Sequence, residues 1–150
     1  MPTSLFINLP VADLDRSKKF YTDIGWTLNP AFTDETAGAL SVGDNIYVMI
    51  LSHENYRRFT NKQIADAAAT SAVINALSVD TPEGVDSFVD RAVEAGGVEG
   101  IAQDYGFMRS RSFADPDGHQ WEAFWMDPVA ASGDWAAVQE KYPDAGSARL

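Results

Sequence analysis

One order of secondary-structure signals occurs twice in this chain, and this duplication constrains the fold more than any other feature. In each copy a short apolar strand precedes a capped helix, a glycine ends the helix, and three strand-like segments follow. Leu9-Pro10-Val11 and Leu77-Ser78-Val79 match at an offset of 68 residues, and Phe20 and Phe88 keep that offset. The repeat is too long for the common solenoid periods and occurs too few times for an array. We therefore predict two small sheets that combine to cover an apolar face.

The first copy covers residues 4–51 as a β-α-β-β-β unit. Asp13 is a typical N-cap for its helix, and Gly25 is placed to end it. Between them an apolar stripe has helical spacing. We expect a strand at 5–9, a helix at 13–24, and strands at 26–28, 39–42 and 45–51.

The second copy covers residues 72–128 and has the same order. Thr81-Pro82-Glu83 has the cap, the proline and the acid of a helix start, and Gly96-Gly97 ends the helix. The residues between them place Val85, Phe88, Val89 and Ala92 on one face. We expect strands at 72–79, 98–102, 107–113 and 120–126, with a turn at 115–118.

Two segments lie outside the repeat. An alanine-rich stretch at about 54–70 predicts a connecting helix between the modules. After a domain at 1–128, the tail at 129–150 contains one short helix, predicted at 135–141.

Composition narrows the function classes. The chain of 150 residues has 22 acidic against 11 basic side chains, a formal charge of −11. This charge argues against nucleic acid and anionic membranes, because both require a basic surface. It would suit a cationic ligand, although acidic surfaces more often serve solubility. No apolar run is long enough to span a membrane, and residues 1–10 lack the pattern of a signal peptide, so we expect a cytoplasmic protein.

Three segments carry a family resemblance. LPVADLDRSKKFYTDIGW resembles the first strand and helix of the vicinal-oxygen-chelate superfamily, ALSVD its fifth strand, and SFADPDGHQWEAFW its last hairpin. This superfamily includes glyoxalase I (lactoylglutathione lyase), bleomycin- and fosfomycin-resistance proteins, and extradiol dioxygenases. The resemblance covers about residues 4–128. It implies an α+β fold in which two βαβββ modules form a curled mixed sheet around a cleft, usually completed by a homodimer.

The resemblance also implies four metal ligands on the strands that line the cleft. The matching positions are Phe6, Met49, Ile74 and Glu122. Since Phe, Met and Ile have no hard donor atoms, three of the four positions are degenerate. With no cysteine in the chain, only two histidines remain to replace them, and both fall outside this ring. The sequence therefore predicts no metal and no other cofactor.

Glu122 is the candidate with the most chemistry. It shares a strand face with apolar and aromatic residues, where an acid needs a partner. If Phe113 pairs with Gln120 across the turn, Arg111 lies opposite Glu122, within reach of a salt bridge. Two interpretations stay open. The pair is either a polar anchor for a ligand, with Glu122 as a catalytic base, or a structural ion pair in a former metal site.

Other ligand-binding candidates are Asn8, Tyr47 and Arg109, together with Arg111. Arg109 shares a face with Arg111, and two arginines on one cleft wall would clamp a carboxylate or phosphate. Alternatively, Arg109 is solvated at the rim. Asn8 faces the cleft with Phe6, where it orients a ligand carbonyl or bonds to neighbouring backbone.

Aromatic residues supply the remaining candidates. Tyr47 alternates with Met49 and adds a hydroxyl to the cleft. Tyr105 lies over the cleft mouth or packs within its own turn. Trp121 and Trp125 are expected to pack against helices or a partner subunit.

Three functions fit these residues. The first is a small-molecule-binding protein, resembling the bleomycin-resistance proteins, without metal chemistry. The alternative is a divalent-metal-dependent lyase or dioxygenase, which the fold favours and the degenerate positions oppose. The third is metal-free acid–base catalysis by Glu122, which a neighbouring Arg111 would disfavour.

Overall fold

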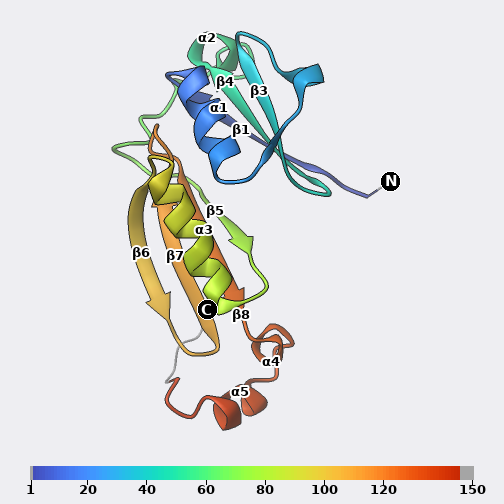
Figure 1. The fold of residues 1–150 in the computed structure, drawn as a ribbon, viewed down its shortest axis with the longest axis vertical. Coiled ribbons are helices and arrows are strands. Elements are labelled where there is room, and N and C mark those ends of the chain that lie inside the picture. Colours follow the sequence, from blue (N-terminus) through green and yellow to red (C-terminus); the bar gives the residue numbers. More distant parts are fainter. Residues whose placement is uncertain (1, 146–150) are drawn as a thin grey trace.

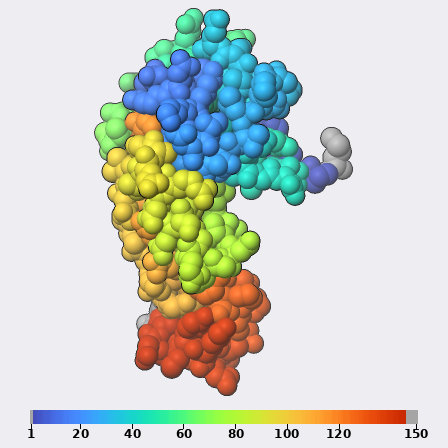
Figure 2. Space-filling view, in the orientation of Figure 1, coloured from blue at the N-terminus to red at the C-terminus, as the bar shows by residue number. Residues whose placement is uncertain are grey.

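The computed structural model describes residues 2–145, which form an elongated molecule of two stacked modules (Figures 1 and 2). The first module contains β1 (Leu5–Val11), α1 (Leu14–Asp23), β2 (Thr27–Leu28), η1 (Pro30–Phe32), β3 (Ala37–Gly43) and β4 (Ile46–Ser52). The second contains β5 (Ile74–Ser78), α3 (Pro82–Glu94), β6 (Val98–Asp104), β7 (Met108–Ala114) and β8 (Gln120–Met126). Three short helices complete the description: α2 (His53–Tyr56), α4 (Pro128–Ala131) and α5 (Trp135–Lys141).

Each module forms its own mixed sheet of four strands. The strand orders are β1-β4-β3-β2 and β5-β8-β7-β6, so the two modules have the same topology. In both, the first strand runs parallel to the last, and the other pairs are antiparallel. The predicted α+β fold of two βαβββ modules is confirmed. The two sheets stay separate, and no closed cleft forms within the described part of one chain.

Capping side chains fix the long helices where the sequence predicts them. The Asp13 carboxylate accepts a hydrogen bond from the Arg16 amide at 3.0 Å, and the Thr81 hydroxyl accepts one from the Gly84 amide at 3.0 Å. Gly25 and Gly96 follow the two helices with φ angles of +106° and +110°, which L side chains rarely adopt. These positions explain why glycine stands at both helix ends.

The two modules share one apolar core. Trp26 of the first module packs edge-on against Trp121 of β8, with ring centroids 5.0 Å apart. Phe20 of α1 lies 6.3 Å from Phe113 of β7 by the same measure. Burial of these aromatic rings between the modules joins them into one folding unit.

A buried polar contact crosses the same boundary. The Tyr21 hydroxyl donates to the Asp115 carboxylate at 2.5 Å, and the Trp121 indole donates to the Tyr21 oxygen at 3.1 Å. Burial raises the pKa of Tyr21, so its hydroxyl remains a neutral donor. Burial also raises the pKa of Asp115, although the contacts with His119 and Tyr21 oppose this. The contact satisfies polar groups that would otherwise destabilise the core.

The expected helix at 54–70 is wrong. Helix α2 ends at Tyr56, and the chain continues to β5 as turns and irregular backbone. In this link the Thr60 hydroxyl accepts from the Lys62 amide at 3.1 Å, and the Asp66 carboxylate accepts from the Ala68 amide at 3.1 Å. Such local side-chain bonds compete with the hydrogen bonds of a helix.

The C-terminal segment lies at the end of the second module, remote from the first (Figure 2). Helix α5 has the bounds that the sequence predicts, whereas the single turn of α4 was not expected. Both pack with Phe107 and Met108 in a second, smaller apolar cluster. The end of the predicted tail, 146–150, lies outside the described residues. No helix among the described residues is both long and apolar enough to cross a membrane.

Candidate functional site

Each sheet has one face against the core and one face that α1 and α3 leave uncovered, which we term its open face (Figure 1). Alternation along the paired strands assigns the residues to these faces. The open face of the first sheet includes Phe6, Asn8, Ala39, Ser41, Tyr47 and Met49. The open face of the second includes Ile74, Ala76, Ser78, Ser112, Gln120, Glu122 and Phe124.

The open face of the first sheet is aromatic and uncharged. The rings of Phe6 and Tyr47 stack with centroids 4.8 Å apart, and Phe6 is 56% exposed. The Tyr47 hydroxyl donates to the Asp44 carbonyl at 3.2 Å. The Asn8 amide donates to the Phe6 carbonyl at 3.3 Å, which is the backbone bond that the sequence left as an alternative. This face therefore offers an apolar surface with an amide oxygen.

Glu122 lies on the open face of the second sheet, and its predicted pairing with Arg111 is wrong. Ser112 stands opposite Glu122, and Arg111 stands opposite Ala123. The strands are joined through a turn of five residues, 115–119, in which the Asp115 carboxylate accepts from two backbone amides of the same turn. The sequence register assumed one residue more in the connection. A shift by one residue moves a side chain to the other face of a strand.

Both arginines lie on the helix-covered face instead. Arg111 donates to Asp86 and Asp90 of α3, at 3.0 Å each, and to Glu99 of β6 at 2.7 Å. Arg109 donates to Asp86 at 2.8 Å and to Asp104 at 3.4 Å. We term these six residues the helix-side ion network. That the two arginines share a face is confirmed, but the face is occupied by α3 and not by an open cleft.

The carboxylates of this network compensate the arginine charges. Partial desolvation tends to raise the pKa of Asp86, but hydrogen bonds from Arg109 and Arg111 hold this pKa below its ordinary value. Partial burial tends to lower the pKa of Arg111, but the hydrogen bonds to Glu99, Asp90 and Asp86 raise this pKa. Both groups therefore stay charged, and the network ties α3 to β6 and β7.

The distribution of charge leaves Glu122 alone on its face. The eight strands contain five charged residues, and four of them, Glu99, Asp104, Arg109 and Arg111, belong to the helix-side ion network. Glu122 is the fifth. Within residues 2–145 its carboxylate has neither an ion-pair nor a hydrogen-bond partner. A half-buried carboxylate without a partner is available to a ligand.

The remaining aromatic candidates have structural contacts. Tyr105 stacks on Phe107 in the C-terminal cluster, with centroids 6.1 Å apart, which is the packing alternative. Trp121 is fully buried in the shared core, and Trp125 packs against it. As expected from the sequence, both tryptophans lie on the helix-covered face.

The four positions that the resemblance assigns to metal ligands do not fit a divalent ion. Phe6 and Met49 lie on one open face, Ile74 and Glu122 on the other, and only Glu122 has a hard donor atom. Elsewhere in the described chain, no three His, Asp or Glu side chains form a group that would hold a metal. The donor chemistry therefore gives the metal no site at these positions.

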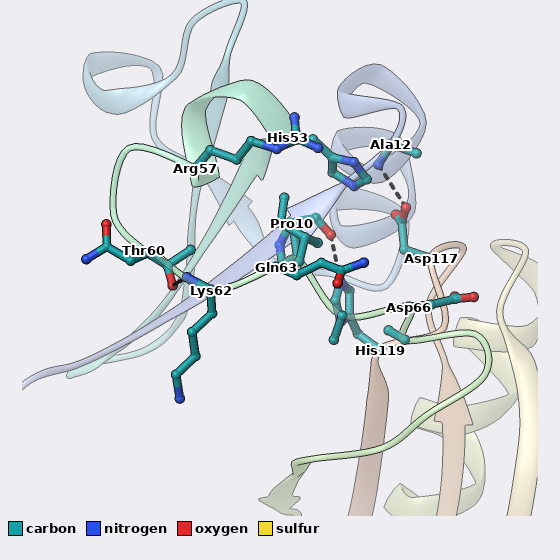
Figure 3. Close-up of a pocket in the computed structure, with 14 residues that line it drawn as sticks. Pro10, Ala12, His53, Arg57, Thr60, Lys62, Gln63, Asp66, Asp117 and His119 are labelled. Atoms are coloured by element: carbon teal, nitrogen blue, oxygen red, sulfur yellow. Dashed lines mark hydrogen bonds between the residues drawn. The ribbon is translucent and has the colours of Figure 1, made fainter.

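Sequence reasoning missed a cavity of about 610 Å³ between the modules (Figure 3). Both histidines, His53 and His119, line it although they are remote in sequence. The turn at 115–119 folds against the end of β1, where the Asp117 carboxylate accepts from the Ala12 amide at 2.8 Å. No local sequence pattern indicates such a contact, because the residues come from three separate segments.

Comparison with known proteins supports the family resemblance. Residues 3–43 match the family model described as bleomycin resistance protein-like N-terminal. No curated protein matches the chain. The fold is shared with many solved structures.

Three of these structures illustrate the similarity. A glyoxalase-related enzyme from Fulvimarina pelagi is 24% identical, with a TM-score of 0.70 over 86% of this chain and 91% of that one. A glyoxalase/bleomycin resistance protein/dioxygenase family enzyme from Burkholderia phytofirmans is 18% identical, with a TM-score of 0.67 over 81% and 96%. The fosfomycin resistance protein FosX from Mesorhizobium loti is 16% identical, with a TM-score of 0.64 over 88% and 98%.

These similarities place the chain among proteins with the glyoxalase/bleomycin resistance/dioxygenase architecture. The part that matches the bleomycin-resistance-like model covers β1, α1, β2 and β3. The family resemblance seen in the sequence is thereby confirmed. At these identities the solved structures define the fold, and the chemistry must be argued from the residues of this chain.

Proposed function

We propose that this protein binds a small organic ligand with a positively charged group on the open faces of its sheets, without metal chemistry. One observation carries the proposal: Glu122 is the single charged strand residue on these faces, and no described side chain compensates its charge. A cationic group would form a charge-assisted hydrogen bond with it.

The surroundings of this carboxylate suit an organic cation. On the second sheet, Ile74 and Ala76 flank Glu122, and Ile74 is 55% exposed. On the first sheet, the stacked rings of Phe6 and Tyr47 offer a π-face to a cation. Small-molecule sites commonly combine such apolar walls with a few polar groups.

A second copy of the chain would complete the cleft. Three large apolar side chains on the open faces are exposed in the single chain: Phe6 on the first sheet, and Ile74 and Val98 on the second. Exposed apolar surface of this extent is typical of an interface. In a homodimer, the first sheet of one copy would face the second sheet of the other. Sedimentation velocity tests this: a dimer supports the shared cleft, and a monomer at micromolar concentration overturns it.

A pair of matched probes tests the charge of the ligand. We expect phenethylammonium to shift amide signals of β5 and β8 in an NMR titration, and its neutral analogue 2-phenylethanol to bind more weakly. Glu122→Gln removes the charge and keeps the shape, so phenethylammonium affinity should fall about tenfold. Glu140→Gln, on exposed α5, is the control and should leave affinity unchanged. Equal binding by Glu122→Gln would overturn the proposal.

The alternative, a divalent-metal-dependent lyase or dioxygenase, is favoured by the shared fold alone. It requires donors that Phe6, Met49 and Ile74 lack. Metal analysis of protein purified without chelators separates the two functions. A stoichiometric divalent ion that is lost in Glu122→Gln would establish the alternative. A catalytic role for Glu122 without metal stays a prediction.

A further inference from the structure

The cavity between the modules is built from three parts of the chain (Figure 3). Pro10 and Ala12 lie at the end of β1 and just after it. His53, Arg57 and residues 60–67 come from α2 and the link, and Asp117 and His119 from the turn before β8. At about 610 Å³ it has the volume of a small-molecule site. Glu122 does not line it, so the cavity does not include the Glu122 carboxylate.

We propose that this cavity binds a small organic oxyanion through a carboxylate or phosphate group. Arg57 and His53 both line it, and Figure 3 shows the Arg57 side chain extending toward His53. Within residues 2–145, neither side chain has a hydrogen-bond or ion-pair partner. The Arg57 guanidinium can donate to both oxygens of a carboxylate or phosphate.

The acidic residues that line the cavity do not pair with Arg57. The Asp117 carboxylate accepts from the Ala12 amide at 2.8 Å, the Ser17 hydroxyl at 3.3 Å and Arg16 at 3.5 Å. The Asp66 carboxylate accepts from the Ala68 amide in its own turn. Both carboxylates are bound to other groups, so the Arg57 guanidinium remains available to a ligand.

Uncharged donors lie beside Arg57 and His53. The Gln63 amide and the Thr60 hydroxyl line the same cavity, and both can donate hydrogen bonds to an oxyanion. His119 is held differently: its Nε2 lies 2.7 Å from the Pro10 carbonyl oxygen, and a carbonyl only accepts, so this nitrogen donates to it. His119 therefore positions the turn, and His53 and Arg57 contact the ligand.

The link is held tightly enough to preserve this geometry. Gly118 has a φ of +95°, and a Cβ there would lie 2.6 Å from the Ala68 amide nitrogen. The backbone of the link thus packs directly against the turn, and only glycine permits this approach. Two walls of the cavity are fixed relative to each other before a ligand binds, which lowers the entropic cost of binding.

An NMR titration at constant ionic strength tests the proposal with two probes, inorganic phosphate and citrate. We expect either anion to shift amide signals at residues 53–66 and 117–119, and the tighter probe identifies the head group. Arg57→Gln should weaken that binding about tenfold. Arg58→Gln changes the charge equally, but Arg58 does not line the cavity, so binding should stay within about twofold of wild type.

Two outcomes would overturn the anion site. One is the absence of localised shifts with both probes, and the other is equal weakening by Arg57→Gln and Arg58→Gln, which would indicate general charge attraction. Thermal unfolding with citrate provides a second measurement, because a ligand that binds the native state raises the Tm. Binding of phenethylammonium should be unchanged in Arg57→Gln, so the result is independent of the function proposed for the open faces.

Discussion

The two modules have the same topology but hold their helices differently. Helix α1 packs through Ser17, Phe20 and Tyr21, and its sheet contains no charged strand residue. Helix α3 buries small aliphatic residues and is also tied to its sheet by the helix-side ion network. Aromatic packing thus holds α1 on its sheet, whereas aliphatic packing and ion pairs hold α3 on the second sheet.

The open faces of the two sheets differ in charge in the same way. The first sheet has no charges to distribute, and its open face is aromatic and neutral. In the second sheet, four of the five strand charges belong to the helix-side ion network, and Glu122 is alone on the other side. The charged strand residues of the second sheet thus gather on its helix-covered face, and its open face keeps the single carboxylate of Glu122.

The largest loss of stability is expected from a change in the apolar core that the two modules share. Trp121→Ala removes a fully buried indole that contacts Trp26 across the boundary, and should cost about 3–5 kcal/mol of unfolding free energy. Urea denaturation should show a single transition at lower urea, because the modules depend on one core. Trp135→Ala, at a side chain 43% exposed in the C-terminal segment, should cost far less. Two separate transitions would contradict a shared core.

A smaller loss of stability should be confined to the second module. The Arg111 side chain is only 13% exposed, and Arg111→Met keeps its aliphatic stem but removes the guanidinium. The change should cost about 1–2 kcal/mol because the freed carboxylates can rehydrate. Amide exchange should accelerate in α3 and stay unchanged in α1. Arg16→Met removes a longer contact, 3.5 Å to Asp117, at a residue 46% exposed, and serves as the control. Equal acceleration in α1 would mean that the network also stabilises the first module.

The smallest effect concerns acid and the C-terminal segment alone. Hydrogen bonds from Lys141 and Tyr142 hold the pKa of Asp127 at about 2. Because this folded-state pKa is depressed, the stabilisation is full above the ordinary carboxyl pKa of about 4 and is lost as pH falls through about 2. Fluorescence of Trp135 should report release of α5 in that window before the modules unfold. Asp127→Asn should abolish this acid-dependent step, and a step of unchanged amplitude would refute the assignment.

Local signals made most of the fold predictable. Caps at Asp13 and Thr81, glycines after both helices, and the 68-residue repeat all depend on residues near one another in sequence or on the match between copies. The helix at 135–141 was found in the same way. The alanine-rich link does not form the predicted helix, because helix propensity is a weak preference when local side-chain hydrogen bonds oppose it.

The site was only partly predictable, and the failures are long-range. Phe6, Asn8, Tyr47, Met49, Ile74 and Glu122 all lie on open faces, because strand alternation alone assigns them. Arg109 and Arg111 share a face as expected, but the length of the turn at 115–119 decided which face it is. The junction cavity depends on contacts between three remote segments, and neither periodicity nor composition carries that information.

The turn at 115–119 also has a consequence for how this chain can change over generations. If one residue were added or deleted there and the shift passed into β8, every side chain of β8 would change face, exposing Trp121 and burying Glu122. No single later substitution would repair both losses. We therefore expect relatives that bind different molecules to vary around Glu122 and to preserve the number of residues between β7 and β8.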